Sequence, residues 1–258
     1  MRRLFRLLRI FVLLATLAIV AASTWLTRLR TTDWDAALWV VIYPINGDGR
    51  PTTAAYIRSL TRRRFAALEQ FFADEARAWE VDIDTPLRVE LAPEVDTLPP
   101  PPPADPAPWR VMPWSLHLRW WAWRADNFPG PAPDIRVFVV YHDPTHVRRL
   151  AHSLGLEKGL IGVVNAFAGR RHAETNNVVI AHEILHTLGA TDKYLPGGQP
   201  RWPDGYAEPA REPRHPQRFA EIMGGRIPVS ASRAVMPPTL HHCVVGEATA
   251  REIRWLRD

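Results

Sequence analysis

The strongest chemical signal in the sequence is a pair of histidines with a glutamate between them. Residues 178–194 read VVIAHEILHTLGATDKY, which places His182 and His186 four residues apart. On a helix, both imidazoles project from one face one turn apart, the spacing that two ligands of a tetrahedral zinc ion need. Glu183 can lie beside the metal without binding it and take a proton from a water that zinc activates. The spacing therefore predicts a zinc site with a general base.

The residues after the second histidine supply a candidate third ligand. Gly189 stands where a helix C-terminus favours a residue that can adopt the left-handed conformation, and Asp192 follows three residues later. A turn at this glycine can bring the chain back toward the metal, so Asp192 can be the third ligand and leave the fourth position to water. The alternative is a buried helix with two hydrogen-bonded histidines and Asp192 on the surface beside Lys193.

The neighbouring residues favour a helix around these histidines. Polar residues that can cap its start precede it, and an apolar stripe runs next to the histidine face. The capping candidates are Thr175, Asn176 and Asn177, and the stripe consists of Val178, Ala181, Leu185 and Leu188.

Two segments together resemble a known family. HEILHTLGATD is similar to the extended zinc motif of the metzincin clan of metallopeptidases, in the version that ends in Asp, and EIMGG at 221–225 is similar to that clan's Met-turn. The resemblance covers residues 175–225 and implies a zincin-like α+β fold, a mixed twisted sheet backed by helices with a mostly irregular C-terminal subdomain. It implies zinc ligands at His182, His186 and Asp192, with Glu183 as the base, Gly189 as the turning glycine and Met223 beneath the metal.

The sequence departs from the clan's pattern in one place, and it contains other residues that could serve as metal ligands. Some metzincins have a tyrosine just after the Met-turn to steady the tetrahedral intermediate, whereas GGRIPVSAS has none, so Tyr194 and Tyr206 are the candidates for that role. A gluzincin-like site would instead take Glu208 or Glu221 as its third ligand. Cys243 is expected to be a buried, unused thiol, and its alternatives are a second metal site with His241 and His242 or a thiolate that blocks the first site.

Hydrophobic patterns predict the elements that position the site. We expect an amphipathic helix capped by Thr61, with its stripe running from Phe65 to Trp79, and a proline-rich loop at 99–108. A turn is expected at 127–133. Continuous or alternating apolar runs predict strands at 37–43, ended by Pro44, and at 87–91, 115–123, 135–141 and 160–167.

Four tryptophans lie in or beside the expected strand at 115–123. Core and cross-strand packing is the predicted use of these side chains, with contact to a bilayer surface as the alternative. They are Trp114, Trp120, Trp121 and Trp123.

The N-terminus carries a membrane signal. Ile10–Thr27 is an uncharged run of 18 residues with four arginines before it, and as a helix it just crosses a hydrocarbon core. The positive-inside rule places residues 1–30 as a cytoplasmic basic stub and transmembrane anchor, with residues 31–258 outside the cytoplasm. The alternative is a secreted protein released by signal cleavage near Ala22.

Charge and composition exclude several classes of protein. The net charge is +5, but residues 1–30 hold six arginines and no acid, so the remainder of the chain carries a slight excess of acidic residues. A nucleic-acid partner is therefore not expected. Cys243 is the single cysteine, which rules out an internal disulfide framework. The hydrophobic content of 47% fits an ordinary globular core.

The combined prediction is a membrane-anchored zinc metallopeptidase that acts on a peptide or protein substrate. Its alternative is a non-catalytic envelope scaffold with a structural zinc site. Glu183 distinguishes the two, because a structural site has no use for a carboxylate there and is usually closed by four protein ligands.

Overall fold

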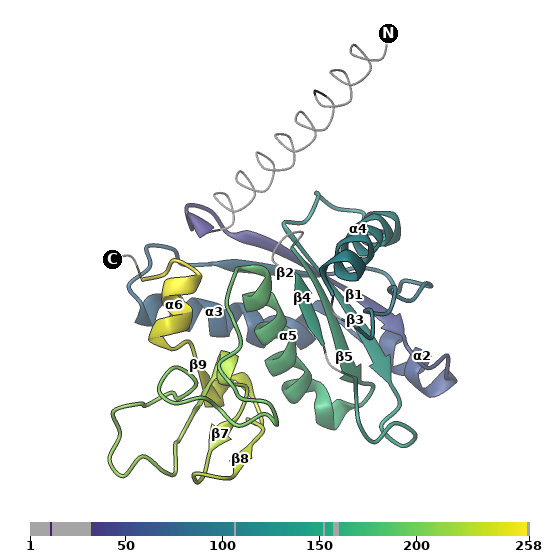
Figure 1. Cartoon of the computed structure of the whole chain (residues 1–258). Coiled ribbons are helices and arrows are strands. Elements are labelled where there is room, and N and C mark those ends of the chain that lie inside the picture. Colours follow the sequence, from purple (N-terminus) through teal and green to yellow (C-terminus); the bar gives the residue numbers. More distant parts are fainter. Residues whose placement is uncertain (1–10, 12–31, 106, 152, 157–159, 257–258) are drawn as a thin grey trace.

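The computed structural model describes residues 11, 32–105, 107–151, 153–156 and 160–256 (Figure 1). The predicted anchor at 1–30 falls almost entirely outside the described residues. Among the residues described, no helix is both long and apolar enough to cross a membrane.

The described chain is built of strands and helices up to residue 187 and then becomes mostly irregular. The strands are β1 Leu38–Asn46, β2 Leu87–Leu91, β3 Ile135–His142, β4 Leu154–Leu156, β5 Ile161–Phe167, β6 Ala220–Glu221, β7 Ile227–Pro228, β8 Ala234–Val235 and β9 Cys243–Val244. The helices are α2 Pro51–Arg58, α3 Ala66–Ala78, α4 Pro108–Ala125, α5 Ala173–Thr187 and α6 Glu247–Glu252, with 3₁₀ turns at Arg62–Phe65, Arg170–His172, Ile222–Gly224 and Leu240–His242.

The central sheet is mostly parallel. Its order is β2-β1-β3-β5-β4, and only β4, at one edge, runs antiparallel to its neighbour. Strands β1 and β3 lie in the interior and are almost wholly buried on both faces, which explains their continuous apolar sequences. The expected mixed sheet with helices is thereby confirmed.

The helices cover both faces of the sheet (Figure 1). One apolar cluster joins α3 and α5 to one face through residues such as Val40 and Val137, and the other joins α4 to the opposite face through Val41 and Phe138. The order β2-β1-β3 accounts for this arrangement. The β1–β2 and β2–β3 connections run in opposite directions across the sheet, so right-handed crossovers place their helices on opposite faces.

The strand predicted at 115–123 is wrong, because these residues belong to helix α4. Leu118, Trp121 and Ala122 face the sheet, a helical spacing, whereas the alternation that suggested a strand brings Leu116 and Trp120 into solvent. Pro108 begins the helix, a position where the missing N–H of proline loses no hydrogen bond. The proline-rich loop accordingly ends one residue before Pro108.

The tryptophans of this segment divide between the two sides of α4. Trp121 is buried against Phe138, with ring centroids 4.6 Å apart, and Trp114 is half-buried and donates its indole N–H to the Pro100 carbonyl. The predicted core packing holds for these two. It is wrong for Trp120 and Trp123, which are exposed.

Smaller differences concern where elements begin and end. Strand β1 continues through Pro44 to Asn46, and Thr61 precedes a 3₁₀ turn without a side-chain cap, so α3 begins only at Ala66. The strands predicted at 87–91, 135–141 and 160–167 are confirmed as β2, β3 and β5.

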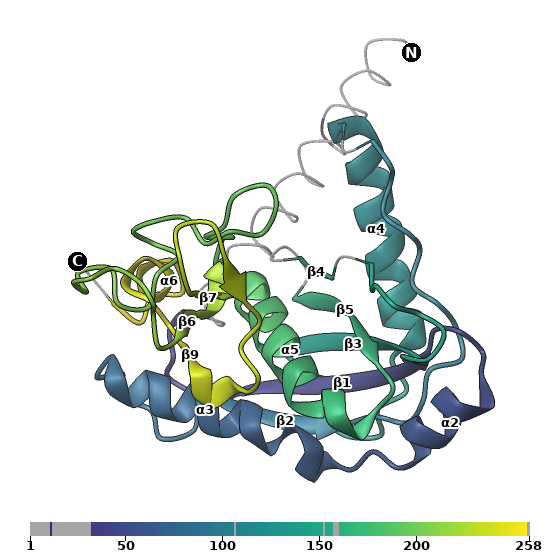
Figure 2. The ribbon, with the colours of Figure 1, turned by 90° about the horizontal axis from the view of Figure 1, so that it is seen from below.

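The C-terminal part from residue 188 consists of short elements, as predicted. It contains two two-stranded sheets, β6-β9 and β7-β8, and ends in the short helix α6. Figure 2 shows these segments gathered beside the C-terminal end of α5. This placement brings the loop after α5 and the 3₁₀ turn at Ile222–Gly224 next to the predicted ligands.

Candidate metal centre

Helix α5 places the two histidines one turn apart. Its buried residues, among them Ile180 and Ile184, pack in the core cluster on the sheet face that α3 also covers, while His182 and His186 lie side by side with ring centroids 4.6 Å apart. The predicted helix is confirmed.

The start of α5 differs from the prediction. His172 occupies the N-cap position, so Thr175, Asn176 and Asn177 lie within the helix. The side-chain amides of Asn176 and Asn177 donate to the carbonyls of Phe167 and Arg64, which lie outside the helix. These asparagines therefore fasten α5 to neighbouring segments, where we had expected a cap.

The end of α5 redirects the chain toward the histidines. Gly189 adopts a φ of 102°, outside the range that other residues readily occupy, and the N–H groups of Gly189 and Ala190 donate to the His186 and Leu185 carbonyls. This pair of bonds is the Schellman arrangement. The turn returns the chain so that Asp192 faces both imidazoles.

The three predicted ligands converge. Oδ1 of Asp192 lies 3.2 Å from Nε2 of His182 and 3.2 Å from Nε2 of His186. One ligand atom from each of these residues lies within 4.8 Å of the others, and this is the one such group of three or more potential metal ligands among the described residues. This group of side chains could hold a metal ion.

Backbone carbonyls fix the orientation of both imidazoles. Nδ1 of His182 lies 2.9 Å from the Ile222 carbonyl, and Nδ1 of His186 lies 2.8 Å from the Ala190 carbonyl. Because a carbonyl can only accept, each Nδ1 must carry a proton and donate it. In the neutral form that binds a metal, each ring would then have its Nε2 lone pair free for the ion, the arrangement typical of metal-binding histidines.

Glu183 is buried beside this group and is not one of its three members. It is 5% exposed, and its Oε2 has no hydrogen-bond partner among the described residues. Burial raises the pKa of Glu183, partly offset by the charges of His182 and His186. A buried carboxylate oxygen without a partner is costly to maintain, and a raised pKa is typical of a group that accepts and returns protons.

The pKa values of Asp192 and His182 depend on each other. Burial alone would raise the pKa of Asp192, but hydrogen bonds from His182 and His186 hold it well below its usual range. Burial lowers the pKa of His182, and the hydrogen bond to Asp192 together with the charge of Glu183 reverses that effect. Asp192 is therefore ionised, as a metal ligand must be.

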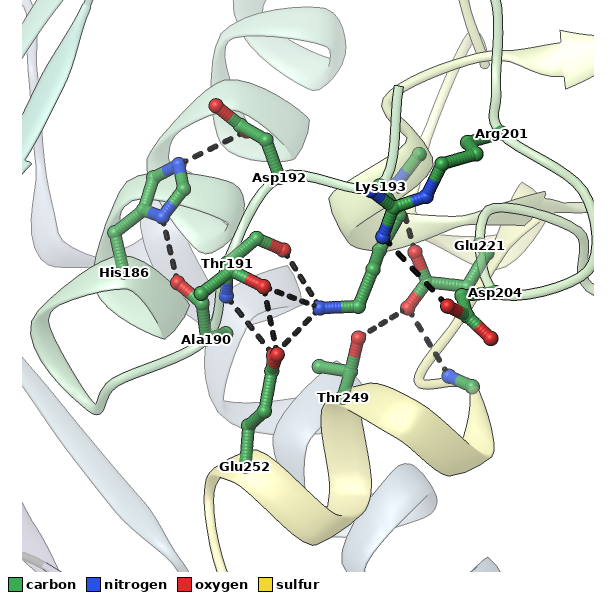
Figure 3. Close-up of polar contacts among 12 residues, drawn as sticks. His186, Ala190, Thr191, Asp192, Lys193, Arg201, Asp204, Glu221, Thr249 and Glu252 are labelled. Atoms are coloured by element: carbon green, nitrogen blue, oxygen red, sulfur yellow. Dashed lines mark hydrogen bonds and ion pairs between the residues drawn. The ribbon is translucent and has the colours of Figure 1, made fainter. Parts of the chain in front are cut away.

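An ion pair between a buried lysine and a half-buried glutamate holds the loop that carries Asp192 (Figure 3). The Lys193 side chain is 2% exposed, and its Nζ donates to Oε2 of Glu252 at 2.6 Å and to the carbonyl and hydroxyl oxygens of Thr191. Glu252 in turn accepts from the backbone N–H and the hydroxyl of Thr191. Residues 191 and 193, on either side of Asp192, are thus fixed to α6.

The turn at Ile222–Gly224 packs against the histidine helix. Met223 is fully buried, its carbonyl accepts from the Lys193 N–H, and the Ile222 carbonyl accepts from His182. Glu221 caps this turn by accepting from the Gly224 N–H, and it also accepts from the Thr249 hydroxyl. Glu221 is thereby engaged in structure, away from the three ligands.

Of the two candidate tyrosines, only Tyr194 lies at the site. Its ring stacks on His182 at 6.4 Å between centroids, and burial together with the nearby Asp192 raises its pKa to about 12. Tyr206 instead hydrogen-bonds His215. Tyr194 is therefore a phenol that remains protonated at neutral pH and can donate a hydrogen bond near the ligands.

The remaining alternative ligands lie elsewhere. Glu208 pairs with Arg211, and Cys243 is buried, with a pKa that burial raises to about 12. His242 faces the Thr239 hydroxyl through Nδ1. The second site considered at Cys243, His241 and His242 is not among the ligand groups found in the described part of the chain.

Two features that shape the site leave no recognisable pattern in the sequence. Strand β4 is three residues long, too short for a recognisable pattern, yet its Gly155 lies directly against α5. A Cβ on Gly155 would lie 2.5 Å from Cβ of His186 and 2.7 Å from the Glu183 carbonyl. The Lys193–Glu252 pair joins residues 59 apart in sequence, and no local pattern signals it.

The arrangement offers two imidazole nitrogens and one carboxylate oxygen to a cation, with a buried carboxyl group beside them. Nitrogen and oxygen donors of this kind suit zinc, and three protein ligands leave one position for water or substrate, as in catalytic zinc sites. In comparisons with known proteins, the chain matches no family model and no curated protein.

Proposed function

We propose that the protein is a zinc-dependent metallopeptidase of the metzincin type, with His182, His186 and Asp192 as its zinc ligands. One observation carries this proposal: Nε2 of both histidines and Oδ1 of Asp192 converge beside the buried, unpartnered Oε2 of Glu183. When bound, zinc would supply Lewis acidity that activates water and polarises a carbonyl.

In this proposal Glu183 and Tyr194, which lie beside the ligands, have separate roles in hydrolysis. Glu183 accepts a proton at its carboxylate from the attacking water and delivers it to the leaving amine. The raised pKa of Glu183 favours this exchange, because it moves the base closer to neutral pH. Tyr194 is the donor placed to hydrogen-bond the developing oxyanion.

The edge of the sheet favours a peptide as the substrate. Strand β4 is an edge strand, and its Gly155 lies against Glu183 and His186. An extended peptide can pair with the outer side of an edge strand through its main chain, which is a common mode of peptide recognition. Such a peptide would run past Glu183 with its carbonyl groups close to the ligands.

The same proposal includes the location of the enzyme. The uncharged run Ile10–Thr27 and the four arginines before it favour a membrane anchor, with the catalytic domain outside the cytoplasm. A secreted form released by cleavage near Ala22 is the alternative.

The competing function is a scaffold with a structural zinc site. Such a site is usually closed by four protein ligands, whereas three residues converge here. A structural site would also leave unexplained why Glu183 is buried beside the ligands without a partner for Oε2.

The test compares two variants in which a glutamate of α5 is replaced by glutamine. Glu183→Gln should keep about one zinc per chain while hydrolysis of an unstructured protein falls by roughly a hundredfold or more, the usual effect of losing a general base. Glu174→Gln changes an exposed glutamate in the first turn of α5 and should leave both properties nearly intact. Equal inactivity of wild type and Glu183→Gln, with zinc bound in both, would support the scaffold. Loss of zinc from Glu183→Gln would make Glu183 a ligand.

A further inference from the structure

Helix α4 carries a stripe of large apolar residues on its solvent side. The stripe follows spacings of three and four, so at 100° per residue its members fall within an arc of about 80°. All are more than half exposed, with Trp109 at 71% and Trp123 at 72%, and the stripe consists of Trp109, Met112, Leu116, Trp120 and Trp123. An ordinary surface helix is polar on this side.

The opposite side of α4 already supplies the core. Leu118, Trp121 and Ala122 are buried in the cluster that contains Tyr43 and Phe138. The outer stripe is therefore not needed to hold α4 on the sheet. Figure 2 shows the N-terminal half of α4 standing out from the sheet, which leaves this half of the stripe well away from the strands.

Cations flank the stripe on both sides. Helix α4 contains Arg110, Arg119, Arg124 and His117 and no acidic residue. The Arg124 guanidinium lies 5.7 Å from the ring centroid of Trp120, and Arg110 pairs with Asp105 in the preceding loop at 3.7 Å. A helix with tryptophan and leucine on one side and arginine along its borders is typical of segments that lie in a membrane interface.

The charges decide between two occupants of the stripe. A second copy of α4 packed on the first would bring arginines against arginines, with no acidic residue on either helix to offset them. An anionic lipid surface offers the opposite charge, and its headgroup region suits tryptophan, which has an apolar ring and a polar N–H.

We propose that the α4 stripe docks on an anionic lipid bilayer. The sequence keeps the domain near such a surface if the predicted anchor is inserted, because Trp34 is buried in the core of the domain and six residues separate it from Thr27. Fully extended, they span at most about 22 Å. Helix α5 packs on the sheet face opposite α4, so docking places the sheet between the histidine helix and the lipid.

The test uses the full chain in lipid vesicles with a spin label on the stripe. The labels are attached at Leu116→Cys and, as a control, at Ser232→Cys in an exposed loop, both in a Cys243→Ala background whose fold is checked by circular dichroism. Collision with oxygen reports lipid, and collision with a water-soluble nickel chelate reports water. In vesicles that contain phosphatidylglycerol, the label at 116 should lose nickel collisions severalfold relative to the label at 232.

The lipid composition tests the role of the arginines. In purely zwitterionic vesicles, the label at 116 should regain most of its nickel collisions. Equal exposure of both labels to nickel in anionic vesicles would overturn the proposal. Equal burial of the label at 116 in anionic and zwitterionic vesicles would overturn it as well. Dipolar broadening at 116 that grows with protein density would assign the stripe to a second copy instead. None of these outcomes depends on zinc or hydrolysis, so the docking proposal can fail while the proposed function stands.

Discussion

Buried Lys193 and half-buried Glu252 form an ion pair, with Nζ 2.6 Å from Oε2, that joins the residue after Asp192 to the last residue of α6. The same carboxylate accepts from both the N–H and the hydroxyl of Thr191. One side chain from the C-terminal helix therefore fixes the chain on both sides of Asp192, the proposed third ligand. Glu252 is therefore a positioning residue for the proposed metal centre, because it holds the residues on both sides of Asp192 in place without contacting the Asp192 side chain.

This relationship predicts an effect of Glu252 on metal affinity. Glu252→Gln removes the charge that compensates Lys193, so the loop should loosen and zinc affinity should fall by about tenfold, as for other residues that orient ligands. Titration against a competing chelator measures the change. Glu247→Gln, on the exposed side of α6, is the matched control. A loss of thermal stability without a loss of zinc affinity would show that the pair serves the fold alone.

The third ligand should be Asp192 and not a glutamate. Asp192→Ala should lower zinc affinity by about a hundredfold or more, because it removes a direct ligand. Glu208→Ala should leave the affinity nearly unchanged, since Glu208 pairs with Arg211 away from the histidines. The opposite ranking in the chelator titration would indicate a gluzincin-like site.

The sequence predicted the convergence of His182, His186 and Asp192 better than it predicted the elements around them. A helix places residues four apart on one face, so the positions of His182 and His186 follow from local geometry, and Gly189 signals the turn that returns Asp192. Between residues 115 and 123, by contrast, helix α4 has apolar residues on both its buried and its exposed side. Their order in the sequence resembles the alternation of a strand. Only the core contacts of Leu118 and Trp121 distinguish the two.

The sequence could not predict contacts between residues far apart in the chain, for a different reason. Glu252 and Thr191 are 61 residues apart, and Asn177 reaches the Arg64 carbonyl across 113 residues. Such pairs depend on how separate elements pack, which no local spacing encodes.

Glu75 should make stability fall as the pH rises. Burial raises the pKa of Glu75 from 4.5 to about 7, although the Val245 N–H donates to its carboxylate. A carboxyl with a raised pKa in the folded state stabilises the fold when protonated, and this contribution is lost as pH rises from about 4.5 through 7. Between pH 5 and 8, Glu75→Gln should gain about 1 to 2 kcal/mol relative to wild type, after allowance for partial exposure. Urea unfolding at each pH measures the gain, and a constant difference between the proteins would contradict it.

Cys243 should be an unreactive thiol. Burial, with the nearby Glu221 and Glu75, raises its pKa to about 12, so at pH 8 only about one thiol in ten thousand is ionised. Iodoacetamide should therefore modify the native protein far more slowly than the protein in denaturant, as followed by mass spectrometry. Added zinc should leave the native rate unchanged, because Cys243 lies outside the ligand group. Rapid native labelling, or protection by zinc, would revive a metal site at this cysteine.

Gly155 and Gly162 pair across β4 and β5 and provide a matched test of how closely the edge strand approaches helix α5. A Cβ on Gly155 would lie 2.5 Å from Cβ of His186, so Gly155→Ala must displace β4 or α5. A Cβ on Gly162 meets nothing closer than 3.6 Å. Gly155→Ala should therefore lose about 1 to 3 kcal/mol of stability and part of its zinc affinity, whereas Gly162→Ala should retain both. Thermal unfolding with and without chelator measures each loss, and equal tolerance of the two alanines would show that β4 does not abut the ligands in solution.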